Sequence, residues 1–182
     1  MIRRSPLDGL ALINGLRELP FLAQLSLRID PSVAADPGHL LGFDLPMKPN
    51  TVAGDERLAA LWLGPDEWLI VGHDGEAARL EGLLREARTS PSGAIVDVSA
   101  NRTTLELRGP RARELLEFGC LIDLYPRVFG PGSCAQTILA RATVIVWFVT
   151  DEPEPVYRLL VRPSLAAYVA AWLADAADGL TD

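Results

Sequence analysis

The chain has 182 residues, a formal net charge of −7 at pH 7 and 49% hydrophobic residues. It is long enough for one large domain or two small modules, and a chain of this size buries roughly 70% of its unfolded surface, so no disulfide or metal is needed to hold it. The excess of acidic residues argues against nucleic acid as a ligand, because binding to phosphates needs a concentrated positive field.

The cysteine content and the hydropathy pattern favour a cytoplasmic protein. Two cysteines, Cys120 and Cys134, are too few for a disulfide framework, and with no evident export signal they are interpreted as reduced thiols. The longest apolar run, at 143–149, is much shorter than the roughly 20 residues needed to cross a bilayer. We therefore expect no membrane contact. Lys48 is the single lysine, and the abundance of arginine and alanine indicates a bacterial source.

Residues 1–19 are predicted to form an N-terminal arm. Its apolar residues, from Leu7 to Leu16, have no clean period. Such an arm gains little from solvation, so we expect it to dock either on its own domain or on another chain. Strict alternation of side chains from Phe21 to Ile29 then predicts a half-buried strand.

Residues 20–100 are predicted to form a first α+β module. A segment rich in proline and glycine holds a short helix near 33–41, and the Gly64–Glu67 turn predicts a hairpin. Asp74 is expected to cap the next helix, in which Glu81 pairs with Arg85. The hairpin strands are expected at 59–63 and 68–71, and the last strand at 94–98. The resulting β-α-β-β-α-β order is that of a ferredoxin-like module.

Residues 101–182 are predicted to form a second α+β module. A hairpin turn near Ser99–Arg102 leads to a strand at 103–108. Pro110 suits the first turn of a helix, and Gly119 can close that helix in a left-handed conformation. Ser164 is expected to cap a final amphipathic helix that continues to Gly179. The remaining strands are expected at 135–140, 143–149 and 156–161.

No constellation of residue types identifies a reaction. His39 is placed in a loop and His73 just before a helix, and neither has a second ligand at metal-binding spacing. Cys134 could act as a nucleophile, but buried cysteine is a common structural residue and no base lies near it in the sequence. No phosphate-binding glycine loop is present.

Two charged groups have both a structural and a functional interpretation. Asp97 lies among apolar strand residues and could pair with Arg102, either to support the hairpin or to serve a site. The arginines of the second module could form a basic patch for an acidic ligand or a partner's carboxylates, or they could lie on a solvated helix face with Arg113 paired to Glu117. The patch would contain Arg102, Arg108, Arg111 and Arg113.

Several segments carry a family resemblance when they are taken together and in order. They are Leu-Arg-Glu-Leu-Pro-Phe at 16–21, Leu-Trp-Leu-Gly-Pro-Asp-Glu-Trp-Leu at 61–69, Val-Asp-Val-Ser at 96–99, Leu-Arg-Gly-Pro at 107–110, Gly-Cys at 119–120 and Pro-Gly-Ser-Cys-Ala-Gln-Thr at 131–137. With these segments the chain resembles the gamma subunit of heterotetrameric sarcosine oxidase over nearly its whole length.

The resemblance implies a fold similar to the folate-binding region of glycine cleavage aminomethyltransferases. It implies a noncatalytic subunit of a complex that demethylates sarcosine oxidatively to glycine, with one-carbon transfer to tetrahydrofolate. The implied partners are alpha, beta and delta subunits, which would hold FAD, FMN, NAD and tetrahydrofolate, with a zinc in the smallest. No cofactor is expected on this chain, and the family supplies no catalytic, cofactor-binding or metal residues to transfer to it.

Two alternatives remain open. The first is a stand-alone folate-binding or one-carbon-transfer protein. A related folate-dependent family has a motif with Lys, Gly, Cys and then Gly-Gln-Glu around 133–137, of which only Cys134 and Gln136 are present, and the missing lysine argues against folate binding. The second is an interaction domain for an unrelated partner.

Overall fold

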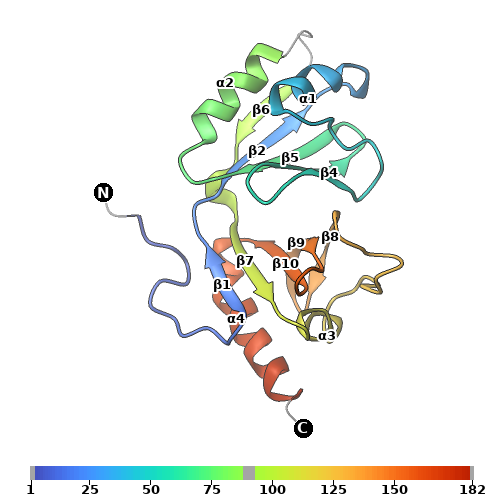
Figure 1. Cartoon of the computed structure of the whole chain (residues 1–182). Helices are drawn as coiled ribbons and strands as arrows, with labels where there is room; N and C mark the ends of the chain where they lie inside the picture. The colour runs from blue at the N-terminus through green and yellow to red at the C-terminus, as the bar shows by residue number, and fades with distance from the viewer. Residues whose placement is uncertain (1–2, 88–92, 181–182) are drawn as a thin grey trace. The chain divides into compact units, whose positions relative to one another are not determined.

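The computed structural model describes residues 3–87 and 93–180, which form an α+β fold with two five-stranded antiparallel sheets. Each sheet belongs to its own compact unit (Figure 1). The terminal unit contains residues 3–20 and 101–180, and the middle unit contains residues 21–87 and 93–100. No helix in these described ranges is long and apolar enough to span a membrane.

The middle unit has the predicted ferredoxin-like arrangement. Helices α1 (Ala35–Leu41) and α2 (Ala77–Ala87) contribute Leu41, Leu80 and Leu84 to a core shared with the sheet. The strand order is β3 (Val52–Gly54), β4 (Ala59–Gly64), β5 (Glu67–Gly72), β2 (Ala23–Arg28) and β6 (Ala94–Asp97). The last four strands form the ferredoxin-like sheet, and β3 extends it at the β4 edge.

Local sequence explains most elements of this unit. The alternation along β2 buries Leu25 and Leu27 against the helices, and Trp68 on β5 fixes the loop before β3 by donating from Nε1 to the Pro46 carbonyl at 2.8 Å. The hairpin of β4 and β5 is confirmed. Strand β2 begins two residues later than predicted because Phe21 adopts a left-handed conformation with φ of 62°.

The sheet of the terminal unit is built from strands distant in sequence. Its order is β1 (Leu16–Leu19), β7 (Thr103–Arg108), β10 (Val156–Val161), β9 (Ala142–Thr150) and β8 (Ser133–Leu139), with every neighbouring pair antiparallel. Helices α3 (Ala112–Glu117) and α4 (Pro163–Asp178) pack with one face of this sheet.

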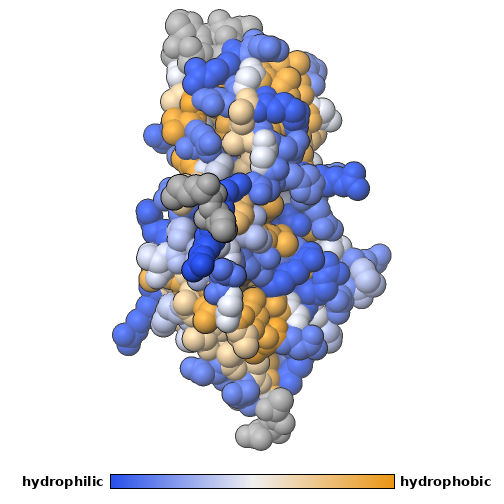
Figure 2. All heavy atoms as spheres, turned by 90° about the vertical axis from the view of Figure 1, so that its left-hand side faces the viewer, coloured by the Kyte–Doolittle hydropathy of each residue, from blue (hydrophilic) through white to orange (hydrophobic). Residues whose placement is uncertain are grey.

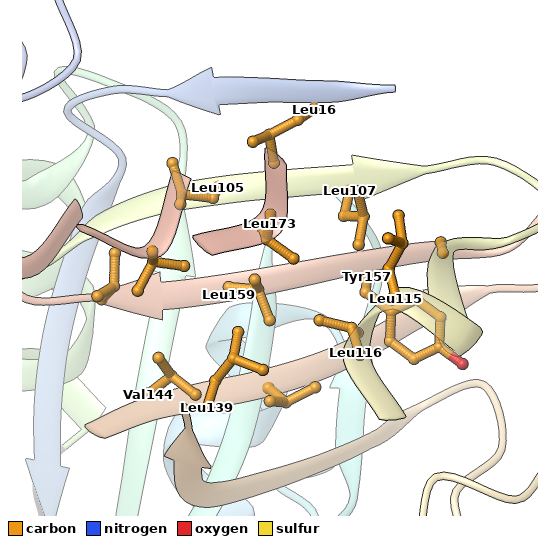
Figure 3. Packing of buried hydrophobic residues seen from close by; sticks show 14 of the residues in the cluster. Leu16, Leu105, Leu107, Leu115, Leu116, Leu139, Val144, Tyr157, Leu159 and Leu173 are labelled. Carbon is orange, nitrogen blue, oxygen red and sulfur yellow. The ribbon is translucent and has the colours of Figure 1, made fainter. Parts of the chain in front are cut away.

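The core of the terminal unit lies between that face and the two helices (Figure 3). Leu105 and Leu159 project from the sheet toward Leu116 of α3 and Leu173 of α4, and all four side chains are buried. Burying one leucine is worth about 1.5–3 kcal/mol, so the alternate apolar positions of β7 and β10 fix which face turns inward. The same alternation leaves Glu106 and Arg158 on the opposite face.

The expected hairpin at residues 99–102 is wrong. Strand β6 pairs with β2 in the middle unit, whereas β7 pairs with β1 and β10 in the terminal unit. The connection is the 3₁₀ helix η2 (Ser99–Asn101). A second 3₁₀ helix, η1 (Pro31–Val33), precedes α1 and is capped by Asp30, whose Oδ1 accepts from the Ser32 amide at 2.9 Å.

Several predicted helix ends are also wrong. Helix α4 begins at Pro163 with Arg162 at the N-cap, because proline is favoured at the first helical position, so Ser164 lies inside the helix. Helix α3 begins at Ala112, after Pro110. Helix α2 begins at Ala77, three residues beyond Asp74.

The predicted role of Gly119 at the end of α3 is wrong as well. Helix α3 ends with Phe118 in a right-handed conformation. The φ of Gly119 lies outside the left-handed range. Instead, a Cβ at Gly119 would meet Cζ2 of Trp172 at 2.6 Å, so this glycine is needed for close packing on α4.

Part of the predicted N-terminal arm is a strand. Residues 16–19 form β1 along the edge of β7, with Leu16 opposite Leu107. Leu7 and Leu16 are buried in the core of the terminal unit. The arm therefore docks on its own chain, which is one of the two outcomes expected.

Candidate functional site

The sheet of the terminal unit carries a row of charged side chains on the face away from its core. In the strand register Glu106 of β7 lies directly opposite Arg17 of β1 on one side and Arg158 of β10 on the other. Arg108, two positions along β7, projects from the same face because side chains alternate along a strand. Three arginines from three strands thus surround one carboxylate.

The distances show how this carboxylate is shared. Glu106 is 0% exposed and Arg158 5% exposed, and Nε of Arg158 donates to Oε2 of Glu106 at 3.1 Å. The guanidinium of Arg158 also lies over Trp147, with Cζ 5.0 Å from the ring centroid, a favourable cation–π geometry. Oε1 accepts from Nε of Arg17 at 2.8 Å and lies 2.6 Å from its terminal nitrogen, whereas Arg108 is 3.7 Å away.

Two shallow recesses adjoin this cluster and share Gly15 and Arg108. The smaller, of about 270 Å³, is lined by Gly15, Leu16, Arg17, Glu106 and Arg108. The larger, of about 380 Å³, extends past Pro110 and Arg111 toward Glu154. Arg108 therefore stands between the two recesses, with its side chain 39% exposed.

The structure divides the predicted arginine patch. Arg108 lies in the cluster described above, but Arg111 pairs with Glu114, with Nε and Oε2 at 2.9 Å. The pKa of Glu114 is lowered, chiefly by its hydrogen bond from Arg111. Arg113 lies 3.4 Å from Glu117, as predicted for an i, i+4 pair. Arg111 and Arg113 thus have acidic partners on their own helix.

The environments of the candidate metal-binding and nucleophilic residues do not favour either chemistry. His39 lies on α1, not in a loop, because the helix continues to Leu41, and His73 precedes α2 as predicted; both are exposed. No group of three metal-binding side chains occurs among residues 3–87 and 93–180. Cys134 on β8 is 0% exposed, and burial raises the pKa of the Cys120 thiol, which opposes thiolate formation.

Asp97 does not occupy the buried position that its apolar neighbours suggested. It lies at the exposed end of β6, where Oδ1 accepts from the amide of Ser99 at 2.9 Å and from its hydroxyl at 2.5 Å. These bonds stabilise the start of η2 in the manner of a local cap. The carboxylate thus serves the junction between β6 and β7.

The connection between α3 and β8 exposes large apolar side chains. Leu124 and Phe129 anchor this segment in the core, while Leu121 is 72% and Val128 66% exposed. The segment also binds the outer edge of β8, where the Leu121 amide donates to the Ile138 carbonyl at 3.1 Å. We define the apolar loop surface by its five exposed residues, Phe118, Leu121, Tyr125, Val128 and Ile138.

A second area of exposed apolar atoms lies on the face of the terminal unit that Figure 2 shows, over the N-terminal arm and α4. Leu10 of the arm is 51% exposed and Tyr168 of α4 is 39% exposed. Such surfaces are typical of chains that contact other proteins.

Comparison with known proteins gives the family. The sarcosine oxidase gamma subunit family matches residues 27–179. The chain belongs to this family. It is 36% identical to the sarcosine oxidase subunit gamma of Corynebacterium sp. (strain P-1), over 96% of this chain and 90% of that protein.

Solved structures support the family and the fold. A chain in the heterotetrameric sarcosine oxidase from Corynebacterium sp. U-96, solved with pyrrole 2-carboxylate, superposes with a TM-score of 0.87 at 36% identity, covering 99% of this chain and 97% of that one. Aminomethyltransferase T of the glycine cleavage system from Bartonella henselae gives a TM-score of 0.67 at 15% identity, over 87% of this chain and 45% of that protein. This second likeness shows the fold alone, and it confirms the expected relationship.

Sequence reasoning missed the cluster around Glu106 and the apolar loop surface. A signal existed for the first, because Glu106 and Arg158 place charges in strands whose other buried residues are uncharged. For the second, apolar residues in a connection rich in proline and glycine could have indicated a contact surface.

Proposed function

We propose that this chain is a noncatalytic assembly subunit of a heterotetrameric sarcosine oxidase. The observation that carries the proposal is the match, over 99% of the chain, to a chain of a solved heterotetrameric enzyme. The proposed reaction of the complex is the oxidative demethylation of sarcosine to glycine, with transfer of the one-carbon unit to tetrahydrofolate.

The chemistry of the described residues favours a contact role over catalysis. Cys134 is buried, burial raises the pKa of the Cys120 thiol, and neither histidine belongs to a group of three metal-binding side chains among the described residues. Arg17, Arg111 and Arg113 are paired with carboxylates. Exposed apolar side chains, by contrast, gather on the α3–β8 connection. An interface between subunits is the usual reason for such a surface.

We assign the apolar loop surface to contact with a larger subunit of the complex. The proposed partners are the alpha, beta and delta subunits, which would hold FAD, FMN, NAD and tetrahydrofolate in the cytoplasm, while this chain would hold none. Phe118 and Tyr125 are suited to this role because aromatic side chains contribute large contact area at interfaces.

Co-expression with the alpha, beta and delta subunits tests the proposal. With a tag on the largest subunit, the purified oxidase should contain this chain in equal amount, and this chain alone should show no sarcosine turnover. The proposal fails if the other three subunits form a complete, fully active oxidase while this chain purifies separately. Omission of this chain from the co-expression should lower the yield of assembled enzyme.

A further inference from the structure

The smaller recess of the terminal unit has an unbalanced positive charge. Arg17 and Arg108 border its opening, with side chains 61% and 39% exposed. Glu106 is the single acid among the described residues that line it. Arginine keeps its charge at any physiological pH, so the recess can attract an anion.

The guanidiniums around Glu106 outnumber the carboxylates. Arg158 already balances Glu106, because the two buried side chains meet at 3.1 Å. Arg17 and Arg108 both add positive charge near the same Oε1, at 2.6 and 3.7 Å. The lining residues themselves contribute two guanidiniums and one carboxylate, a net positive charge, and Arg17 and Arg108 face a repulsion that another anion would relieve.

The donors available in the recess favour a carboxylate over a phosphate. Phosphate sites commonly use free backbone amides. Here the amide of Leu16 donates to Ile13 and the amide of Arg108 donates to Gly15, so neither is free. The side-chain donors of the recess are the planar forks of Arg17 and Arg108, which match the two oxygens of a carboxylate.

We propose that the recess beside Glu106 binds a carboxylate group, with Arg108 as the principal ligand and Arg17 as the second. Arg108 is the better placed of the two because its distance of 3.7 Å from Glu106 exceeds that of a hydrogen bond, which leaves its donors available. The carboxylate could come from an acidic side chain of a partner subunit or from a small free acid. Both sources present the same chemistry.

The first experiment uses the purified full-length chain. Arginine Nε–Hε signals are followed by NMR during titration with sodium acetate and sodium glutarate at constant ionic strength, with sodium phosphate as the competing chemistry. Saturable shifts of Arg17 and Arg108 are expected. Arg108→Gln should weaken binding by about tenfold, the loss of one hydrogen bond to a charged group, and Arg108→Lys should weaken it less.

A matched control is Arg85→Gln, which removes the same charge from an exposed arginine of α2 whose partner is Glu81 at 2.6 Å. It should leave acetate binding unchanged. The thermal midpoint of each variant shows that the fold is intact. Tighter binding of phosphate than of acetate overturns the assignment of a carboxylate, and so does equal weakening by Arg85→Gln and Arg108→Gln.

The second experiment rests on the proposed function and measures association with the larger subunits. If the carboxylate belongs to a partner, Arg108→Gln should weaken association by about tenfold, since interfacial ion pairs couple the two chains, while Arg85→Gln should not. Binding of acetate with no effect on association identifies a free acid as the ligand. No saturable binding together with unchanged association overturns the proposal. If no complex forms, the proposed function fails and the first experiment alone decides.

Discussion

Among single residues, the buried charged side chains of the terminal unit should be the least tolerant of substitution. Glu106 has no exposed surface, and Arg158 beside it is almost fully buried. Removing one member of such a pair leaves the other as an uncompensated buried charge, which is far more costly than losing an exposed pair. The members of this cluster lie on β1, β7 and β10, so they meet only when these strands pair in the observed register.

We predict that Glu106→Gln lowers the free energy of unfolding by about 3 kcal/mol, because it removes the buried carboxylate that pairs with the buried guanidinium of Arg158 at 3.1 Å. Urea denaturation measures the change. The control is Glu81→Gln, which breaks the exposed pair with Arg85 and should cost about 0.5 kcal/mol or less. Equal small losses in the two variants would contradict the interpretation.

Tyr157 gives a prediction for alkaline pH. Burial raises the pKa of its hydroxyl from 10.0 to about 12, and the hydroxyl has no hydrogen-bond partner. Between these two pKa values the unfolded chain loses the proton and the folded chain keeps it, so stability falls as pH rises. The loss should be about 2–3 kcal/mol between pH 10 and 12.

The measurement is urea denaturation at pH 8 and at pH 11.5, comparing the natural chain with Tyr157→Phe. The variant should lack this part of the alkaline loss and should unfold normally at pH 8, since no hydrogen bond is removed. Tyr168→Phe, at an exposed position on α4, serves as the control. The interpretation is refuted if both variants keep the full pH dependence.

At the scale of elements, close packing of α4 against the end of α3 depends on a glycine. Gly119→Ala should destabilise the chain by about 1–3 kcal/mol, because its Cβ would meet Trp172 at 2.6 Å. Gly82→Ala is the opposite case, since no atom lies within 4 Å of its Cβ and alanine favours a helix by about 0.5–1 kcal/mol. Thermal denaturation of both variants should give shifts of opposite sign, and shifts of the same sign would contradict this account.

The elements that could be predicted from sequence are those that local periodicity specifies. Strict alternation predicted β2 and β7, and a proline-containing turn predicted the β4–β5 hairpin. Helix starts were misplaced where two local signals competed, as when Pro163 at the first helical position outweighed Ser164 as a cap. Proline at the first helical position and serine at the N-cap are both local signals, and the sequence alone does not show which of them sets the start of the helix.

Elements that depend on distant pairing could not be predicted. Residues 16–19 are too few for a periodic pattern, and they form β1 because β7 offers them an edge. Similarly, nothing local shows that the strands beside residues 99–101 belong to different sheets. The cluster around Glu106 has the same origin, since Arg17 and Glu106 are 89 residues apart and meet only through this register.

At the scale of the whole molecule, the exposed apolar side chains link the fold to the proposed assembly. Leu121→Glu should weaken association with the larger subunits by about tenfold, because it places a charge in an apolar contact. The free energy of unfolding of the Leu121→Glu chain should change by about 0.5 kcal/mol or less, since Leu121 is exposed. Surface plasmon resonance measures the affinity.

The control for this surface is Leu40→Glu, which places the same charge at an exposed leucine of α1 in the middle unit. It should leave the affinity unchanged. If both variants weaken association equally, the effect comes from net charge, and the assignment of the apolar loop surface to the interface is wrong.

The segment that follows α3 covers one end of the edge strand β8. It occupies the last hydrogen-bonding positions of the outermost strand, with a bridge between Cys120 and Leu139 and bonds on either side of it. An incoming peptide therefore cannot pair with β8 at Ile138 and Leu139, where this segment already lies. Recognition at that end of β8 must depend on shape and side-chain chemistry.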